Sequence, residues 1–133
     1  MEVKAITRFA RISAFKAREV TREIQGMSAL LALDVVRFSP KKAARLVSKT
    51  LATAIANAEN NNHLKAQNLF IKEAVVGEGP TFKRFQPKAR GSAGPIRKRT
   101  AHIKIILIEQ EVKQEKKAKK AAKTEAAKPE AKS

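Results

Sequence analysis

The sequence predicts an α+β fold, in which three helices pack on a small antiparallel sheet and a long β-hairpin protrudes from the body. Apolar residues recur at helical spacing through residues 14–59, which is typical of amphipathic helices. Alternating or β-branched runs at 2–12, 69–78 and 102–109 indicate three strands. Between the last two runs, a basic segment with turn residues at 80–101 indicates the hairpin.

The first strand and the first helix follow from alternation and capping. Residues 2–12 alternate in character, with Val3 and Ala5 on one side of the expected strand. Ser13 has the side chain of a helix N-cap, and Gly26 is a typical helix stop. The helix expected between them has apolar residues at helical spacing, namely Ala14, Ala17, Val20 and Ile24.

The second helix is predicted to be more apolar than the first. Ser28 is its expected N-cap, and Leu31, Val35 and Phe38 form one face of it. The pair Ser39-Pro40 then predicts the start of a third helix, because a capping side chain is followed by Pro at the first helical position.

The third helix is expected at about 41–59, with the run Asn60-Asn61-Asn62-His63 as its end. Its spacing predicts a buried stripe made of Ala44, Val47, Leu51, Ile55 and Ala58. Its first half is crowded with the cations Lys41, Lys42, Arg45 and Lys49. Cations near a helix N-terminus oppose the helix dipole, so this arrangement favours a helix that faces phosphate.

The expected hairpin is the most informative segment. The chain has no acidic residue from Pro80 to Ile108, and Gly91 and Gly94 mark a turn near the middle. Arms of about ten residues reach about 33 Å at ~3.3 Å per residue, whereas a domain of this size has a radius of gyration of only ~13 Å. Phe82 and Phe85 lie among cations, a mixture that suits stacking on unpaired bases and binding to phosphate.

Net charge indicates the class of partner. The chain has 29 Lys and Arg against 12 Asp and Glu, which gives a formal charge of +17. Such a charge favours a polyanion, and RNA is the expected one. Three alternatives stay open: a nucleoid-type DNA-binding protein, an anionic membrane surface, and a soluble basic protein without a polyanionic partner. A membrane is the weaker reading, because no helix joins a basic face to an aromatic or Leu-rich one.

Domain organisation and location follow from length and composition. The 133 residues predict one domain at 1–112 and a tail at 113–133 rich in Lys, Ala and Glu, either a solvated helix or disordered. The N-terminus lacks the apolar core of a signal peptide, and no apolar run is long enough to span a bilayer. We therefore expect a cytoplasmic protein.

Enzymatic and metal chemistry find little support. The chain has no Cys, so disulfides and thiolate metal sites are excluded, and the two histidines lack metal-ligand spacing. Ser13 and Lys16 match the S-x-x-K of serine acyl-enzymes, but the other motifs of that class are absent. No phosphate-binding G-x-x-x-x-G-K-[ST] loop is present. We expect neither catalysis nor a cofactor, although a serine acyl-enzyme remains a second hypothesis.

Several motifs resemble one family in order and spacing over residues 3–109. The run Ala10-Arg11-Ile12-Ser13-Ala14-Phe15-Lys16-Ala17-Arg18 is similar to the A-R-x-S-x-x-K-x-R of the bacterial large-subunit ribosomal protein L twenty-two family. Ala54-Ile55-Ala56-Asn57-Ala58-Glu59 resembles the end of the long helix of that family. Its hairpin signature resembles Gly79-Pro80, Pro87-Lys88-Ala89-Arg90-Gly91 and Ile96-Arg97-Lys98-Arg99-Thr100-Ala101-His102-Ile103.

The resemblance implies an assembly role without catalysis. It implies a body packed on large-subunit ribosomal RNA beside neighbouring ribosomal proteins, and a hairpin that threads between RNA segments to the wall of the nascent-peptide exit tunnel. The nascent peptide would then pass the hairpin tip. No homo-oligomer is expected. Two positions depart from the family pattern: Ser92 stands where many members carry a cation, and Gly94-Pro95 replaces a bulkier pair.

The expected RNA-binding residues come from this resemblance and from the distribution of charge. Those on the hairpin and its base are Lys83, Arg84, Lys88, Arg90, Arg97, Lys98, Arg99 and His102. Those on the body are Arg8, Arg11, Ser13, Lys16, Arg18, Lys41, Lys42 and Arg45. The residues of the tip expected to face the tunnel are Lys88, Ala89, Arg90, Gly91, Ser92, Ala93 and Gly94.

Overall fold

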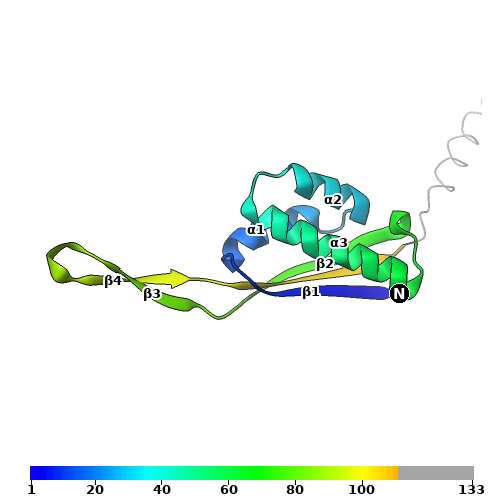
Figure 1. Ribbon diagram of the computed structural model, residues 1–133. Helices are drawn as coiled ribbons and strands as arrows, with labels where there is room; N and C mark the ends of the chain where they lie inside the picture. Colours follow the sequence, from blue (N-terminus) through cyan, green and yellow to red (C-terminus); the bar gives the residue numbers. More distant parts are fainter. Residues whose placement is uncertain (111–133) are drawn as a thin grey trace, which may run out of the picture.

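The computed structural model describes residues 1–110, which form a helix-covered sheet with a projecting hairpin. The expected tail at 113–133 lies outside the described residues. The elements, in chain order, are β1 (Glu2–Ala10), α1 (Ala14–Ile24), α2 (Ala29–Phe38), α3 (Lys42–Asn62), β2 (Leu69–Glu78), β3 (Phe82–Pro87), β4 (Ala93–Lys98) and β5 (Ala101–Glu109). The helices cover one face of the β1-β5-β2 sheet, and the β3-β4 hairpin extends from the end opposite the N-terminus (Figure 1). The predicted α+β fold class is confirmed.

The central strand of the sheet is β5, which pairs antiparallel with β1 on one side and β2 on the other. Its run of β-branched residues reflects this position, since Ile103, Ile105 and Leu107 are fully buried under the helices. The β1 pairing shifts register between Thr7 and Ala10, where Phe9 has a φ of 56°. This irregularity lies next to the base of the hairpin.

Helices α1 and α3 supply most of the helical side of the core. The predicted stripe on α1 is confirmed, because Ala14, Ala17, Val20 and Ile24 are all buried. The predicted stripe on α3 is also confirmed, with Ala44, Val47, Leu51, Ile55 and Ala58 buried. A polar contact ties α3 to the sheet, where the hydroxyls of Thr7 and Thr50 lie 2.8 Å apart.

Helix α2 has its larger apolar side chains on the side away from the core. The core side of α2 consists of Ala29, Ala32 and Val36, all buried. Leu31, Val35 and Phe38, expected to form one face, are exposed to solvent. The side of α2 that contacts α3 and β2 is thus made of smaller residues. The larger apolar side chains of α2 point to solvent.

The start and the end of α3 also differ from the sequence prediction. The helix begins at Lys42 with Lys41 at the N-cap, so Ser39 and Pro40 precede it in extended backbone instead of capping it. Ser39 instead follows α2, where its amide donates to the carbonyl of Val36. The helix continues through Asn62, and His63 ends it in the left-handed region with a φ of 53°.

The hairpin is a two-stranded ribbon with no cover on either face. Its register runs from Phe82 opposite Lys98 to Pro87 opposite Ala93. The reversal lies at Arg90 and Gly91, whose φ values are 59° and 70°. Gly91 is thus in the turn, as expected, but Gly94 is paired within β4. A Cβ on Gly94 would meet the side chain of Lys88, so the glycine makes room for that lysine.

Candidate nucleic-acid interface

The hairpin arms present their cations to solvent with no compensating acid. Residues 82–98 are exposed apart from a half-buried Gly94, so the predicted cations at 83, 84, 88, 90, 97 and 98 are all accessible. Lys83 lies directly opposite Arg97 in the ladder. Like charges at opposed positions destabilise a β-ribbon. An external anion would remove that penalty, which makes the ribbon well suited to contact phosphates.

A hollow at the junction of hairpin and body brings together cations that are distant in sequence. It has a volume of about 310 Å³ and is lined by Ile12, Ser13, Lys16, Lys42, Arg97 and Arg99. Lys16 comes from α1 and Lys42 from the start of α3, whereas Arg97 and Arg99 come from the returning arm of the hairpin. Among residues 1–110, none of these four cations forms an ion pair. We call these six residues the junction hollow.

The N-terminal end of α1 adds to the positive character of the junction hollow. Ser13 occupies the N-cap position, as predicted, but its hydroxyl makes no capping hydrogen bond. The first turn of α1 therefore keeps backbone N–H groups without intrahelical partners, and these carry the positive end of the helix dipole. Four cations, a helix N-terminus and a hydroxyl together suit a phosphate group.

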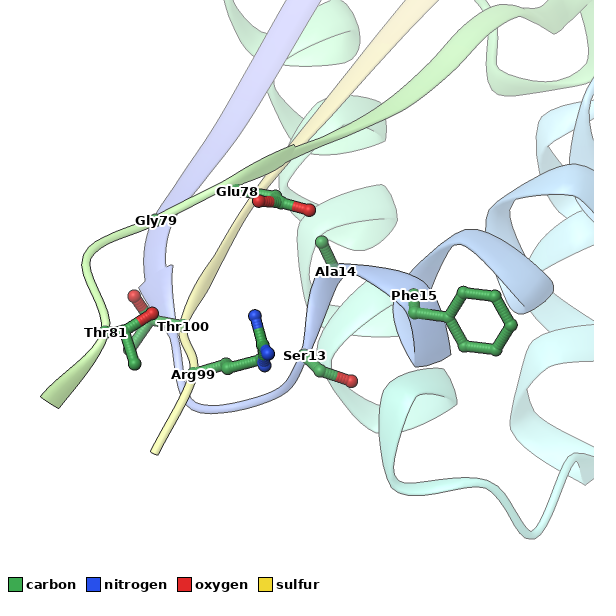
Figure 2. Close-up of a pocket in the computed structure, with 8 residues that line it drawn as sticks. All are labelled: Ser13, Ala14, Phe15, Glu78, Gly79, Thr81, Arg99 and Thr100. Atoms are coloured by element: carbon green, nitrogen blue, oxygen red, sulfur yellow. The ribbon is translucent and has the colours of Figure 1, made fainter. Parts of the chain in front are cut away.

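A neighbouring hollow of about 280 Å³ shares Ser13 and Arg99 with the junction hollow. In Figure 2, the Arg99 guanidinium lies between the strands and the start of α1, Glu78 lies at the opposite rim, and the ring of Phe15 points away from the space. The carboxylate of Glu78 makes this hollow less suitable for phosphate. Ser13 and Arg99 thus line both hollows.

Two predicted body cations are already engaged within the protein. The Arg18 Nε donates to the carbonyl of Val76 at 3.2 Å, and its guanidinium lies 4.0 Å from the Glu78 carboxylate. The Lys41 ammonium lies 3.6 Å from both Glu19 and Glu23. These contacts hold α1 against β2 and against the start of α3. The structure therefore gives Arg18 and Lys41 a role in positioning elements of the body.

His102 has a clear structural contact at the base of the hairpin. Its Nδ1 accepts a hydrogen bond from the amide of Phe9 at 3.1 Å, and the two rings meet edge to face at a centroid distance of 4.9 Å. The imidazole thereby supports the irregular turn of β1 at Phe9. Arg8 and Arg11 flank this turn and are exposed, so both are accessible to a partner. Arg45 lies elsewhere, at the corner between α2 and α3.

Aromatic rings on the outgoing arm of the hairpin are accessible for stacking. Phe85 is 77% exposed and Phe82 is 42% exposed. The Arg84 guanidinium lies 6.0 Å from the centre of the Phe82 ring, within the range of a weak cation–π contact. Rings beside cations provide the two contacts that an unpaired nucleotide needs, one for the base and one for the phosphate.

The exposed pair of Glu2 and Lys72 lies at the other end of the sheet. The hydrogen bond and charge of Lys72 lower the pKa of the Glu2 carboxyl, and the same bond raises the pKa of Lys72. The pair joins β1 to β2 beside the N-terminus and takes no part in the candidate interface.

Within residues 1–110, no three His, Cys, Asp or Glu side chains gather where they could hold a metal ion. None of the helices in that range combines the length and the apolar character needed to cross a membrane.

Comparisons with known proteins identify the family of this chain. Residues 5–108 match the family model described as Ribosomal protein L22p/L17e. A protein of Methylacidiphilum infernorum named Large ribosomal subunit protein uL22 is 63% identical over 113 residues, which is 85% of this chain and 99% of the relative. Relatives of the same name from Akkermansia muciniphila and Opitutus terrae are 55% and 53% identical and cover 84% and 82% of this chain, and 99% and 96% of their own lengths. The chain therefore belongs to the family Ribosomal protein L22p/L17e.

Proposed function

We propose that this chain is a structural constituent of the large ribosomal subunit that binds large-subunit ribosomal RNA and supports assembly. The family and the name of the relatives give the subunit. The observation that carries the mode of binding is the junction hollow, where four cations without an ion pair in the described residues meet from α1, α3 and the hairpin. Membership of a ribosomal protein family also argues against the serine acyl-enzyme hypothesis.

The mechanism is scaffolding. Lys and Arg neutralise backbone phosphates and release counterions, which supplies affinity. The folded body fixes the register of the contacts, because its cations come from elements held in place by one core. The hairpin reaches RNA segments beyond the body and gains order as its like charges meet phosphate. Neighbouring proteins of the subunit are the other partners, and no self-association is part of this role.

Selective RNA binding is the test of this function. The full chain should bind large-subunit RNA with a log affinity that falls by ~0.7–0.9 per neutralised phosphate for each unit of log salt. At moderate salt, duplex DNA at equal nucleotide concentration should not displace the RNA. Displacement would favour the nucleoid-type alternative and contradict the proposal. Co-sedimentation with large subunits in high salt is the matching measurement on ribosomes.

We propose further that the hairpin tip reaches the wall of the nascent-peptide exit tunnel. The proposal rests on the family resemblance and on the projection of the β3-β4 ribbon away from the body (Figure 1). Deletion of 88–94 should leave the helices intact, since none of these residues contributes to the core. Subunits should still assemble, with altered passage of particular nascent peptides.

Crosslinking provides the decisive measurement for the tip. A photoreactive group at Arg90 in translating ribosomes should label the growing peptide or tunnel RNA. A matched group at Lys65, which is exposed on the body, should label neither the peptide nor tunnel RNA. Labelling from position 90 of solvent-side proteins alone would contradict the proposed direction of the hairpin.

A further inference from the structure

The corner between α2 and α3 exposes an aromatic ring. Phe38 is the last residue of α2 and is 89% exposed, more than any other large apolar side chain among residues 1–110. Val36, two positions earlier, is buried at 2% exposure and holds the end of the helix on the core. Ser39 and Pro40 then connect α2 to α3. The Phe38 ring is thus exposed to solvent at the end of α2.

A hollow of about 350 Å³ opens beside this ring. Its lining consists of Val36, Arg37, Phe38, Ser39, Pro40, Arg45 and Ser48, and contains no acidic residue. Neither arginine forms an ion pair in the described part of the chain. The hollow therefore combines one aromatic face, two uncompensated guanidinium groups and two hydroxyls.

This combination matches the chemistry of an unpaired nucleotide. Every base has a π-face that stacks on an aromatic ring, a guanidinium binds phosphate through paired N–H donors, and a serine hydroxyl can exchange hydrogen bonds with a ribose. A duplex would not satisfy the ring, because its base faces are already stacked. The positive charge of the lining favours RNA over an apolar peptide as the occupant.

We propose that this corner is a second RNA-binding site, in which an unpaired base stacks on Phe38 while Arg45 and Arg37 hold the adjoining phosphate. The inference rests on the proposed RNA-binding function but uses residues outside the junction hollow and the hairpin. Of its members, only Arg45 belongs to the expected RNA-binding residues.

The composition of the chain allows a local optical test. The protein contains no Trp and no Tyr, so F38W in the full chain creates a single indole reporter in the hollow. A short unstructured RNA should quench this indole by stacking, whereas an RNA duplex of equal length should leave it unchanged. L31W is the matched control, because Leu31 is exposed on the same helix but does not line the hollow. Its fluorescence should not respond to either RNA.

Arg45 provides the second arm of the experiment. On the F38W background, R45Q should remove most of the quenching, because the phosphate contact that positions the base is lost. K65Q makes the same change in charge on an exposed body residue outside the hollow, and should preserve the quenching. Circular dichroism should show all variants folded, since every substituted side chain is exposed.

The outcomes separate this site from the general function. RNA binding measured by anisotropy with no change in F38W fluorescence would overturn the second site and leave the proposed function standing. If the unmodified protein did not bind RNA, that result would instead contradict the proposed function. In assembled large subunits, a photoreactive group at position 38 should crosslink to RNA. Crosslinks to protein from both 38 and 31 would show that the apolar face of α2 docks a protein, and would overturn the inference.

Discussion

At the residue scale, Gly79 shows how little space separates the sheet from the hairpin. A Cβ at Gly79 would lie 2.5 Å from the Thr100 hydroxyl and 3.3 Å from the Thr100 carbonyl carbon. That hydroxyl cannot move aside easily, because it donates to the carbonyl of Pro80 at 2.6 Å and Thr100 is only 3% exposed. The amide of Gly79 also donates to the carbonyl of Thr100 at 3.0 Å. Gly79 and Thr100 together form the joint between body and ribbon.

We predict that Gly79→Ala lowers the free energy of unfolding by about 1–3 kcal/mol, the usual cost of overpacking a tight site. Gly77→Ala is the matched control, since the nearest atom to its added Cβ would be the Cβ of His102 at 4.0 Å. Urea unfolding of both variants provides the measurement. Equal destabilisation by the two substitutions would contradict the tight joint at Gly79.

A second residue-scale prediction concerns the junction hollow. Lys42→Gln should reduce the slope of log affinity for RNA against log salt by ~0.7–0.9, the loss of one phosphate contact. Lys65→Gln changes the charge equally on an exposed body residue outside the hollow and should leave the slope unchanged. Equal slopes for Lys42→Gln and the unmodified protein would remove Lys42 from the interface.

The sequence indicates which cations are candidates for RNA binding, but it does not show which of them have partners within the protein. Lys16 and Arg97 were both expected to bind RNA, yet their convergence in one hollow depends on how α1 packs against the hairpin base. Arg18 and Lys41 have the same local signature, but carboxylates brought near by the fold engage them. Charge is visible in a sequence, whereas ion pairing is a tertiary property.

At the element scale, the strands and the stripes of α1 and α3 were predictable because periodicity is local information. The bounds of β2 agree with the expected 69–78, and β5 begins only one residue earlier than expected. For helix α2, the spacing placed Leu31, Val35 and Phe38 on one face but did not indicate that this face is exposed. The core side of α2 consists of the smaller Ala29, Ala32 and Val36, because which side of a helix is buried depends on tertiary packing.

The hairpin leads to a prediction about backbone dynamics. An isolated two-stranded ribbon is marginal in water, and this one also has like charges opposed across its ladder. In the free protein, amides of 83–98 should therefore exchange with solvent rapidly, whereas amides of 43–58 in α3 should be protected. Addition of large-subunit RNA should slow exchange in the ribbon. Strong protection of 83–98 without RNA would contradict folding on binding.

At the scale of the whole molecule, a compact body holds one end of a cationic ribbon and leaves the other end free (Figure 1). The body carries the core, while residues 82–98 contribute nothing to it. The junction hollow, proposed to bind RNA, lies where the ribbon begins, and a backbone hydrogen bond between Gly79 and Thr100 joins the ribbon to the sheet. The body thus anchors the ribbon, and the ribbon extends beyond the body.

The expected role of the tail gives a prediction for the complete chain. A truncation after Val112 should still join the large subunit, because the core cluster and the junction hollow lie entirely within residues 1–110. RNA affinity at low salt should fall, since the removed segment is rich in Lys. Sucrose-gradient sedimentation of subunits with the truncated protein provides the measurement. Absence from the subunit would show that the tail is a structural element.

The central place of β5 also determines when this protein can fold during its own synthesis. Both outer strands, β1 and β2, depend on β5 for their ladder hydrogen bonds, and β5 is the last strand to be translated among those of residues 1–110. The ladder between Val3 and Leu107 spans nearly the whole described chain, so loop closure is slow compared with helix formation. Nascent chains that end before Ala101 should therefore contain helices but not the β1-β5-β2 sheet. Until β5 is synthesised, β1 and β2 lack the strand that pairs with both of them, and unpaired strands are prone to aggregation.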